Sequence, residues 1–378
     1  MILMLAAFGI SLLVTLAVVR TQNRQHSASL DHDLSGPQKF HAHAVPRIGG
    51  VGLLSGIVTA LFIGWLRGDP AVSLGVLLVL CGLPAFAAGL MEDLTKQVSP
   101  ARRLFFTAVS AALAGIILDS LITRTAIPGL DTLAAFTLGA FAITVFAVAG
   151  VANAINIIDG FNGLASMCGV LILATLAYVA FQAGDPMLAS LCLLAIGALL
   201  GFFVWNFPAG LIFLGDGGAY FLGFFIAEIA VLLLHRNPTV SPMLALLVCI
   251  YPIFETVFSI YRRRFIRDVP PSMPDGIHLH SLIYRRLLKG AVGSEEAKAL
   301  ARRNSMTSPY LWLLCMTSLA PSMLFWDNTA ALTVCIILFV VAYIVVYWRI
   351  VRFKTPRWMI MHRSRRNERT SGKGKTPT

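Results

Sequence analysis

The feature that most constrains this chain is a succession of apolar runs, each about as long as a helix needs to cross a lipid bilayer. Hydrophobic residues make up 57% of the sequence and charged residues only 13%, a balance that a soluble globular surface does not tolerate. Backbone groups in hydrocarbon must satisfy their hydrogen bonds within the chain, which helices do by themselves. The sequence therefore predicts an all-α polytopic membrane protein.

The apolar runs predict about 11 transmembrane helices. The first run has no basic segment before it and no small-residue cleavage site, so we expect a retained helix rather than a removed signal peptide. The predicted spans are residues 2–19, 48–66, 71–90, 103–123, 132–151, 164–182, 187–206, 218–234, 241–260, 309–326 and 329–347.

Lysine and arginine residues orient these spans, because they are retained near span ends on the cytoplasmic side. With the N-terminus outside, the outer loops contain only Arg67, Arg124 and Arg236, and the inner segments contain the other 27 of the 30 basic residues. We therefore expect a transmembrane domain at 1–350 and a basic, flexible cytoplasmic tail at 351–378. The inner loops are then residues 20–47, 91–103, 152–163, 207–217 and 262–308.

The net charge of +12 arises in the juxtamembrane loops and the tail. Basic residues placed there favour anionic membrane lipids as partners. We do not expect nucleic acid as a partner.

Carboxylates in apolar surroundings gather at the inner ends of the predicted spans. The outer acidic residues stand beside turns or span ends, with no accompanying Gly-rich or His-bearing pattern. Glu228 differs, because it lies near the middle of a span, where an ionisable group is costly. A hydrogen bond inside the bundle and a role in a site both remain open for it. The inner-end carboxylates are Glu92, Asp93, Asp159, Asp216 and Glu255.

Residues 37–52 combine cations with flexible backbone. Lys39 and Arg47 precede the pair Gly49 and Gly50, which opens a span. Cations beside the start of a helix suit phosphate. The general retention of basic residues in inner loops is the alternative explanation.

Residues 89–104 contain the adjacent acids Glu92 and Asp93, followed by Arg102 and Arg103. The acids could hold a cation or a substrate, and the bases could clamp phosphoryl oxygens. A charged helix cap is the alternative.

Two polar segments without Lys or Arg interrupt the apolar sequence. Asn156, Asp159 and Asn162 recur at every third position, so a helix would align them roughly on one face. Asp216 is flanked by glycines just before a span, which suits a hard divalent cation near a helix N-terminus. A tight Asp-Gly turn is the alternative for Asp216.

His278 and His280 stand at alternate positions in the longest inner loop. An extended chain would face both to one side. A zinc pair is the alternative, but no third nitrogen or sulfur ligand is evident. Contact with a phosphate or a nucleotide is the favoured interpretation.

The order and spacing of five inner segments match one family. They read KFHAHAVPRIGG, EDLTKQVSPARRL, NAINIIDGFNGL, NFPAGLIFLGDGG and PDGIHLH, between about residues 37 and 286. The chain resembles the polyprenyl-phosphate N-acetylhexosamine-1-phosphate transferases of glycosyltransferase family 4. It is most similar to the branch that acts on undecaprenyl phosphate and N-acetylglucosamine (GlcNAc), because HLH resembles that branch and the peptidoglycan branch has three adjacent histidines.

The sequence departs from the family pattern at three positions. Glu92 replaces the first Asp of the usual pair, Asn162 replaces a frequent Asp, and Ser281 replaces the last His. The first departure puts the role of Glu92 in doubt, and the third puts the sugar or nucleotide preference in doubt.

The resemblance implies roles for individual residues. Asp216 would be the principal magnesium ligand, with Asn162 as a second ligand or a nucleoside contact. Asp93, beside Glu92, would orient or deprotonate the lipid phosphate. The residues implied to contact the nucleotide-sugar, its uracil or its phosphates are Lys39, Arg47, Asn156, Asp159, Asn206, Phe213, His278 and His280.

The resemblance also implies a reaction and a place. GlcNAc-1-phosphate would pass from a UDP-sugar to undecaprenyl phosphate with release of UMP, initiating a lipid-linked cell-surface polysaccharide such as O-antigen or common antigen. The cofactor would be Mg²⁺, with Mn²⁺ as the alternative. The catalytic domain would lie in the bacterial inner membrane with its N-terminus periplasmic and its active site on the cytoplasmic face.

Several alternatives stay open. In one alternative the sugar donor is another UDP-amino sugar or UDP-MurNAc-pentapeptide. Whether the chain forms a homodimer also stays open. A polytopic transporter is the alternative of another class. We disfavour it because no internal repeat is visible and the polar groups lie at one face rather than at the midplane.

Overall fold

The structure is a computed structural model that describes residues 1–24, 45–267, 278–288 and 297–352. Within these ranges the regular structure is helical, apart from an isolated bridge at Pro46. The all-α prediction is confirmed. The helices are α1 (Ile2–Arg24), α2 (Gly50–Leu66), α3 (Ala71–Thr95), α4 (Pro100–Ile117), α5 (Leu130–Ala134), α6 (Thr137–Ile158), α7 (Leu164–Gln182), α8 (Pro186–Asn206), α9 (Gly215–Arg236), α10 (Pro242–Val248), α11 (Ile250–Tyr261), η1 (Arg262–Arg267), α12 (Leu279–Leu282), η2 (Ile283–Leu287), α13 (Ala297–Leu324) and α14 (Thr329–Val351).

Eight of the described helices are long and apolar enough to cross a membrane, or nine if a bent pair is counted as one span. Helix α2 is apolar but has only 17 residues. The chain is therefore a multi-pass membrane protein, and the count of eleven spans and their orientation stay predictions.

Two regions differ from the expected elements. The predicted span 241–260 is a broken helix, because α10 and the helix that follows it are bent by 71° at Cys249. The predicted inner loop 262–308 does not run to its expected end, because α13 already begins at Ala297. The apolar pattern missed this helical start, because Lys298, Arg302 and Arg303 interrupt its apolar residues.

Helix α9 forms the centre of the bundle. Its apolar window is completely buried, and α3 and α6 pack against it on either side. Glycines allow the closest approach: a Cβ at Gly89 of α3 would lie 2.5 Å from the backbone of Asp216, and a Cβ at Gly50 would lie 2.5 Å from Gly218. Small residues at such crossings let membrane helices approach closely. The first turn of α9 is thereby brought against α2 and α3.

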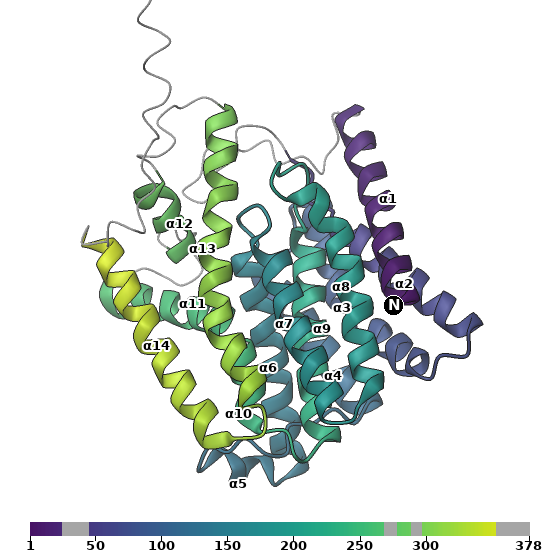
Figure 1. The fold of residues 1–378 in the computed structure, drawn as a ribbon, viewed down its shortest axis with the longest axis vertical. Coiled ribbons are helices and arrows are strands. Elements are labelled where there is room, and N and C mark those ends of the chain that lie inside the picture. The colour runs from purple at the N-terminus through teal and green to yellow at the C-terminus, as the bar shows by residue number, and fades with distance from the viewer. Residues whose placement is uncertain (25–44, 268–277, 289–296, 353–378) are drawn as a thin grey trace, which may run out of the picture.

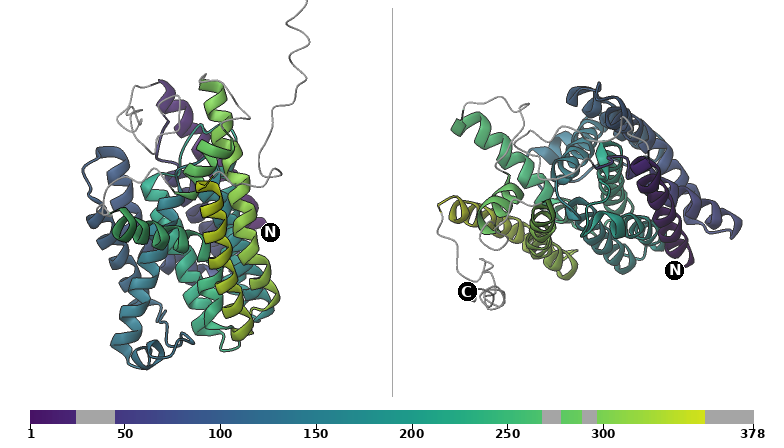
Figure 2. Two further views of the ribbon diagram at one scale, coloured as in Figure 1. Left: turned by 90° about the vertical axis from the view of Figure 1, so that its left-hand side faces the viewer. Right: turned by 90° about the horizontal axis from the view of Figure 1, so that it is seen from above.

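The remaining helices flank this centre (Figure 1). Helix α1 packs on α2 and α8 at one side, and α13 and α14 stand at the other, with α13 against α7. Helix α11 runs across the direction of its neighbours, as both views show (Figures 1 and 2). The short helix α12, which follows His278, lies beside α13 and α14.

Candidate functional site

The N-terminus of α9 is capped by two carboxyl groups from other parts of the chain. Asp93 of α3 accepts hydrogen bonds from the backbone N–H groups of Asp216 (3.0 Å) and Gly217 (2.9 Å). Asp159, directly after α6, accepts from the N–H of Gly215. The first N–H groups of a helix lack partners within it, and the helix dipole favours negative charge there. These carboxylates therefore fix where α9 begins.

Gly215 makes this junction possible. Its φ is +76°, a conformation that glycine adopts readily and other residues rarely do. A Cβ there would collide with the carbonyl of Arg47 and would lie 2.7 Å from Asp93 Oδ2. The glycines around Asp216 therefore serve close packing as well as the turn.

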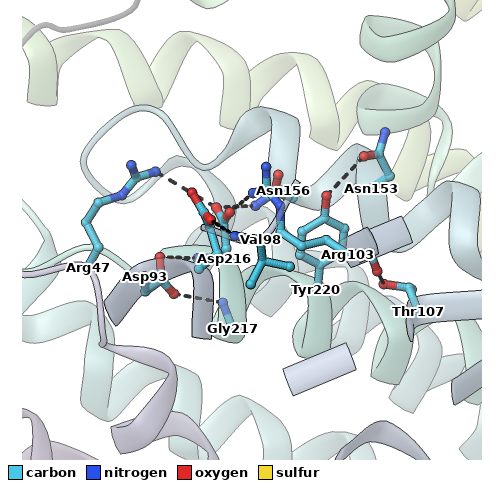
Figure 3. Close-up of polar contacts among 11 residues, drawn as sticks. Arg47, Asp93, Val98, Arg103, Thr107, Asn153, Asn156, Asp216, Gly217 and Tyr220 are labelled. Carbon is cyan, nitrogen blue, oxygen red and sulfur yellow. Dashed lines mark hydrogen bonds and ion pairs between the residues drawn. The ribbon is translucent and has the colours of Figure 1, made fainter. Parts of the chain in front are cut away.

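The side chain of Asp216 collects polar groups from three other segments (Figure 3). Asn156 of α6 donates from Nδ2 to Asp216 Oδ1 over 3.0 Å, and Arg47 Nη2 lies 3.9 Å from the same oxygen. Arg103 of α4 forms an ion pair with Oδ2. Arg47 and Arg103 approach from two sides, so a buried carboxylate and two guanidinium groups share one small volume.

Arg103 has an aromatic support that the sequence analysis missed. Its guanidinium lies 6.0 Å from the ring centroid of Tyr220, whose hydroxyl donates to Asn153 Oδ1 over 3.3 Å. Tyr220 stands one helical turn after Asp216, and this spacing was the available signal. The contact holds Arg103 toward the site.

The surroundings of Asp159 shift the pKa of its carboxyl group. Although Asp159 keeps part of its surface exposed, burial of its carboxyl group raises its pKa to about 8. Arg47 and the N–H of Gly215 lower that pKa, and the nearby Asp93 raises it. Desolvation disfavours the charged form of a carboxyl, so Asp159 holds its proton at neutral pH in the ligand-free protein.

Glu92 lies apart from these contacts. Its Oε2 accepts a hydrogen bond from the N–H of Val98 over 2.8 Å. Lys96, between them, has a φ of +57°, so Glu92 closes the tight turn between α3 and α4. A role for Glu92 in chemistry stays a prediction.

Asn206 and Phe213 are both held within the fold. Asn206 accepts from the N–H of Gly163 (2.7 Å) and donates to the carbonyl of Ile212 (2.7 Å). The N–H of Phe213 donates to the carbonyl of Pro46 over 2.9 Å, and its side chain is buried. Both residues tie the segment before α9 to neighbouring chain, and their predicted contacts with the nucleotide-sugar stay predictions.

Asn162 is bound to α13 and to Pro208. Its Nδ2 donates to the Pro208 carbonyl and to Ser305 Oγ, both over 3.1 Å, and its N–H donates to Asn304 Oδ1 over 2.8 Å. Ser308 donates to its carbonyl over 2.6 Å. Its Oδ1 is buried and has no hydrogen-bond partner within the described ranges. The α13 residues were missed because they fell in a predicted loop.

The histidine segment adjoins this loop. His278 Nδ1 lies 2.9 Å from Glu255 Oε1, and the ring of His280 lies 5.0 Å from that of Phe161, in the loop between α6 and α7. The structure thus brings together residues predicted from separate segments. Lys39 lies outside the described residues.

The candidate metal-ligating atoms of the site meet only part of what a hard divalent cation needs. No group of three His, Cys, Asp or Glu residues able to hold a metal occurs among the described residues. Magnesium is usually held by one or two carboxylates together with substrate phosphates. The carboxylate of Asp216, and the buried Oδ1 of Asn162, are oxygen donors of the required kind. Asp216 therefore suits an ion that is completed by substrate oxygens, and the role of Asn162 as a second ligand stays a prediction.

Comparisons with known proteins identify the family of the chain. The model of Glycosyl transferase family 4 matches residues 75–234. A probable undecaprenyl-phosphate N-acetylglucosaminyl 1-phosphate transferase of Bacillus subtilis is 30% identical over 286 residues, covering 74% of this chain and 77% of the relative.

Two further relatives represent two branches. An undecaprenyl-phosphate alpha-N-acetylglucosaminyl 1-phosphate transferase of Yersinia pestis is 26% identical, covering 66% of this chain and 68% of the relative. A phospho-N-acetylmuramoyl-pentapeptide-transferase of Clostridium perfringens is 30% identical, covering 59% of this chain and 70% of the relative. The chain therefore belongs to glycosyl transferase family 4 and is a multi-pass membrane enzyme.

Proposed function

We propose that this enzyme transfers GlcNAc-1-phosphate from UDP-GlcNAc to undecaprenyl phosphate, releasing UMP, at the cytoplasmic face of the bacterial inner membrane. The Bacillus subtilis relative, named for this reaction, matches over 77% of its own length, against 70% for the Clostridium perfringens relative named for the pentapeptide reaction. Another UDP-amino sugar or UDP-MurNAc-pentapeptide is the alternative donor. The product would prime a cell-surface polysaccharide.

One observation carries the proposal. Arg47, Arg103 and Asn156, from three separate segments, converge on the carboxylate of Asp216 at the start of α9. Guanidinium groups bind phosphoryl oxygens through paired, charge-assisted hydrogen bonds. Two of them beside one metal-capable carboxylate suit a diphosphate better than a sugar or a lipid chain.

The chemistry needs little from a protein base. A phosphate oxygen of undecaprenyl phosphate would attack the β-phosphorus of the UDP-sugar, and the bond to the oxygen of UMP would break. A phosphate monoester with its second pKa near 6 is about nine-tenths dianionic at neutral pH. We therefore propose a single displacement, in which Arg47 and Arg103 offset the developing charge and position the phosphates.

The capping carboxylates would act as positioning groups. Both oxygens of Asp93 accept backbone N–H groups of α9, which holds Asp216 in place. A bound Mg²⁺, or Mn²⁺ in its stead, would neutralise diphosphate charge, and Asp216 is the residue that would hold it, with Asn162 as the second candidate.

A direct assay tests the proposal. Membranes containing the protein are mixed with labelled UDP-GlcNAc, undecaprenyl phosphate and Mg²⁺, and organic-extractable label and released UMP are measured. We expect both products, and we expect EDTA to abolish them and Mn²⁺ to restore them. The absence of product with every UDP-amino sugar and with UDP-MurNAc-pentapeptide would refute the proposal. Transfer from the pentapeptide donor alone would move the enzyme to the peptidoglycan branch.

The positive charge of the chain indicates binding partners other than the two substrates. Anionic lipids suit the basic residues at the bundle ends and in the tail, and the sequence carries a net charge of +12. The mass of the purified enzyme in nanodiscs distinguishes a homodimer from a monomer.

A further inference from the structure

A buried hydrogen-bonded cluster joins α11 to the histidine segment. Glu255 is only 1% exposed. Its Oε1 lies 2.9 Å from Nδ1 of His278 and accepts from the N–H of Leu279 over 3.1 Å. Its Oε2 accepts from the hydroxyl of Tyr343 over 2.6 Å. One carboxyl group thus connects three separate helices, α11, α12 and α14.

The other donors decide which His278 nitrogen carries hydrogen. A backbone N–H can only donate, and the Tyr343 hydroxyl donates to the second oxygen. An ionised carboxylate has only acceptor sites, which matches three donors around it. His278 must then donate from Nδ1, because an ionised carboxylate has no hydrogen to give. Nε2 is the ring nitrogen that Glu255 leaves for other contacts.

The cluster continues toward the candidate site through stacked rings. The ring of His278 stacks on that of His280 with centroids 5.0 Å apart and planes 17° apart. His280 lies 5.0 Å from Phe161, two residues after Asp159 and one before Asn162. A turn of the His278 ring would therefore disturb the packing of the loop that carries the polar site residues.

We propose that Glu255 is a positioning residue for the transfer. It holds His278 with Nδ1 protonated and presents Nε2 to the nucleotide-sugar, while the stacked rings hold the loop between α6 and α7. This inference rests on the proposed function for the identity of the substrate, and on the contacts of Glu255 for the orientation of the ring.

The protonation of the His278 ring can be measured without any enzyme turnover. The full chain, labelled with ¹⁵N-histidine and held in nanodiscs, gives ring nitrogen shifts that report which nitrogen is protonated. The sequence has eight histidines, so the His278 signal is assigned by difference with His278→Gln. We expect Nδ1 protonated in the wild type and a changed protonation pattern in Glu255→Ala.

Kinetics separate positioning from folding. Removing the partner that orients a metal-ligating imidazole costs about 10- to 100-fold. We expect a loss of kcat/KM of similar size in Glu255→Ala, chiefly as a higher KM for the UDP-sugar with an unchanged KM for undecaprenyl phosphate. Glu255→Gln should stay within about threefold of wild type, because a carboxamide oxygen still accepts from His278 and Leu279 while its NH₂ faces the Tyr343 oxygen.

A matched control exists on α9. Glu228 is also a fully buried glutamate on an apolar helix, and its Oε2 accepts from Ser120 over 2.8 Å. Glu228→Gln repeats the loss of a buried carboxylate away from the histidines, and we expect it to leave the His278 signal and both KM values unchanged.

Each outcome decides one claim. An unprotonated Nδ1 in the wild type, or an unchanged His278 signal in Glu255→Ala, overturns the inference even if the enzyme transfers sugar phosphate normally. A wild-type enzyme that transfers nothing, with Nδ1 protonated as expected, refutes the proposed function and leaves the Glu255–His278 orientation established. If Glu255→Ala does not fold, the wild-type spectrum and Glu255→Gln still decide.

Discussion

The carboxylate of Asp93 accepts a hydrogen bond from the backbone N–H of Asp216, 123 positions further along the chain. This contact joins the last turn of α3 to the first turn of α9 and places the two aspartates in different roles. Asp93 stabilises the start of a helix, and Asp216 directs its own carboxylate to Arg47, Arg103 and Asn156.

Replacing Asp216 by Asn tests the charged centre. The substitution keeps the size of the side chain but removes the charge that balances two guanidinium groups and would hold the metal. We expect kcat to fall by about 10²- to 10³-fold or more, as when a preorganised electrostatic group is lost, with the thermal midpoint retained. Asp119→Asn is the control, because that side chain is 82% exposed. Wild-type turnover in Asp216→Asn would remove Asp216 from the site.

Asp93→Asn tests the capping role. A carboxamide offers one acceptor oxygen where two N–H groups need partners, and its NH₂ would face one of them. An unsatisfied buried donor costs about 1–3 kcal/mol, so we expect the free energy of unfolding and the activity both to fall. Asp69→Asn is the control, because the Asp69 carboxylate lies at the other end of α3, where its Oδ1 accepts from the N–H of Ala71. Equal stability in Asp93→Asn and wild type would contradict the capping role.

Single displacement predicts that Asp93 is never phosphorylated. Both of its oxygens are engaged by backbone N–H groups, and it is 1% exposed. Incubation with UDP-sugar and Mg²⁺ alone, followed by intact-mass and peptide spectrometry, should show unmodified protein. Detection of phospho-Asp93 would establish a double displacement instead.

Asn304 is expected to position the loop between α6 and α7. In Asn304→Ala the buried N–H of Asn162 loses its acceptor, which costs about 1–3 kcal/mol and should raise the KM for the UDP-sugar. Asn304→Asp keeps an acceptor and should recover most of the stability. Ser318→Ala on the same helix serves as the control, since the Ser318 hydroxyl donates to the carbonyl of Cys315 within the helix. A KM unchanged in Asn304→Ala would exclude the positioning role.

Asp159 gives a pH prediction for the ligand-free enzyme. Burial raises its pKa from 3.8 to about 8. Between these two pH values the folded protein therefore keeps a proton that the unfolded chain has already released. The stability that this group contributes is full below about pH 4 and is lost as pH rises to 8. Asp159→Asn mimics the protonated form, so its advantage in thermal midpoint over wild type should grow between pH 5 and 8. A difference independent of pH would contradict the shift.

Hydrophobic periodicity predicted the helical class and the approximate spans, because lipid imposes long apolar runs. It did not predict the 71° break at Cys249 or the start of α13 at Ala297. The first depends on tertiary packing. The second is a helical start rich in basic residues, and the helix that it opens contacts the loop between α6 and α7, where Asn304 accepts from the N–H of Asn162 and Trp312 donates to the carbonyl of Gly163.

The site was predictable as a set of residue types but not as a set of contacts. Glycine-flanked Asp216 and the pair Glu92 and Asp93 stand out in sequence. That Asp93 caps α9 while Glu92 closes a turn depends on how α3 approaches α9 at Gly89, which no local pattern encodes. Tyr220 was missed although it stands one helical turn after Asp216, because an aromatic residue in an apolar helix looks like core.

The most direct test follows the β-phosphorus of the donor. The enzyme is given UDP-GlcNAc labelled with ³²P at the β-phosphate, together with undecaprenyl phosphate and Mg²⁺, and the organic and aqueous phases are separated. Transfer of a sugar-1-phosphate predicts that the label enters the lipid and that the released nucleotide is unlabelled UMP. Label remaining in the aqueous phase as UDP, with or without sugar in the lipid, would contradict it.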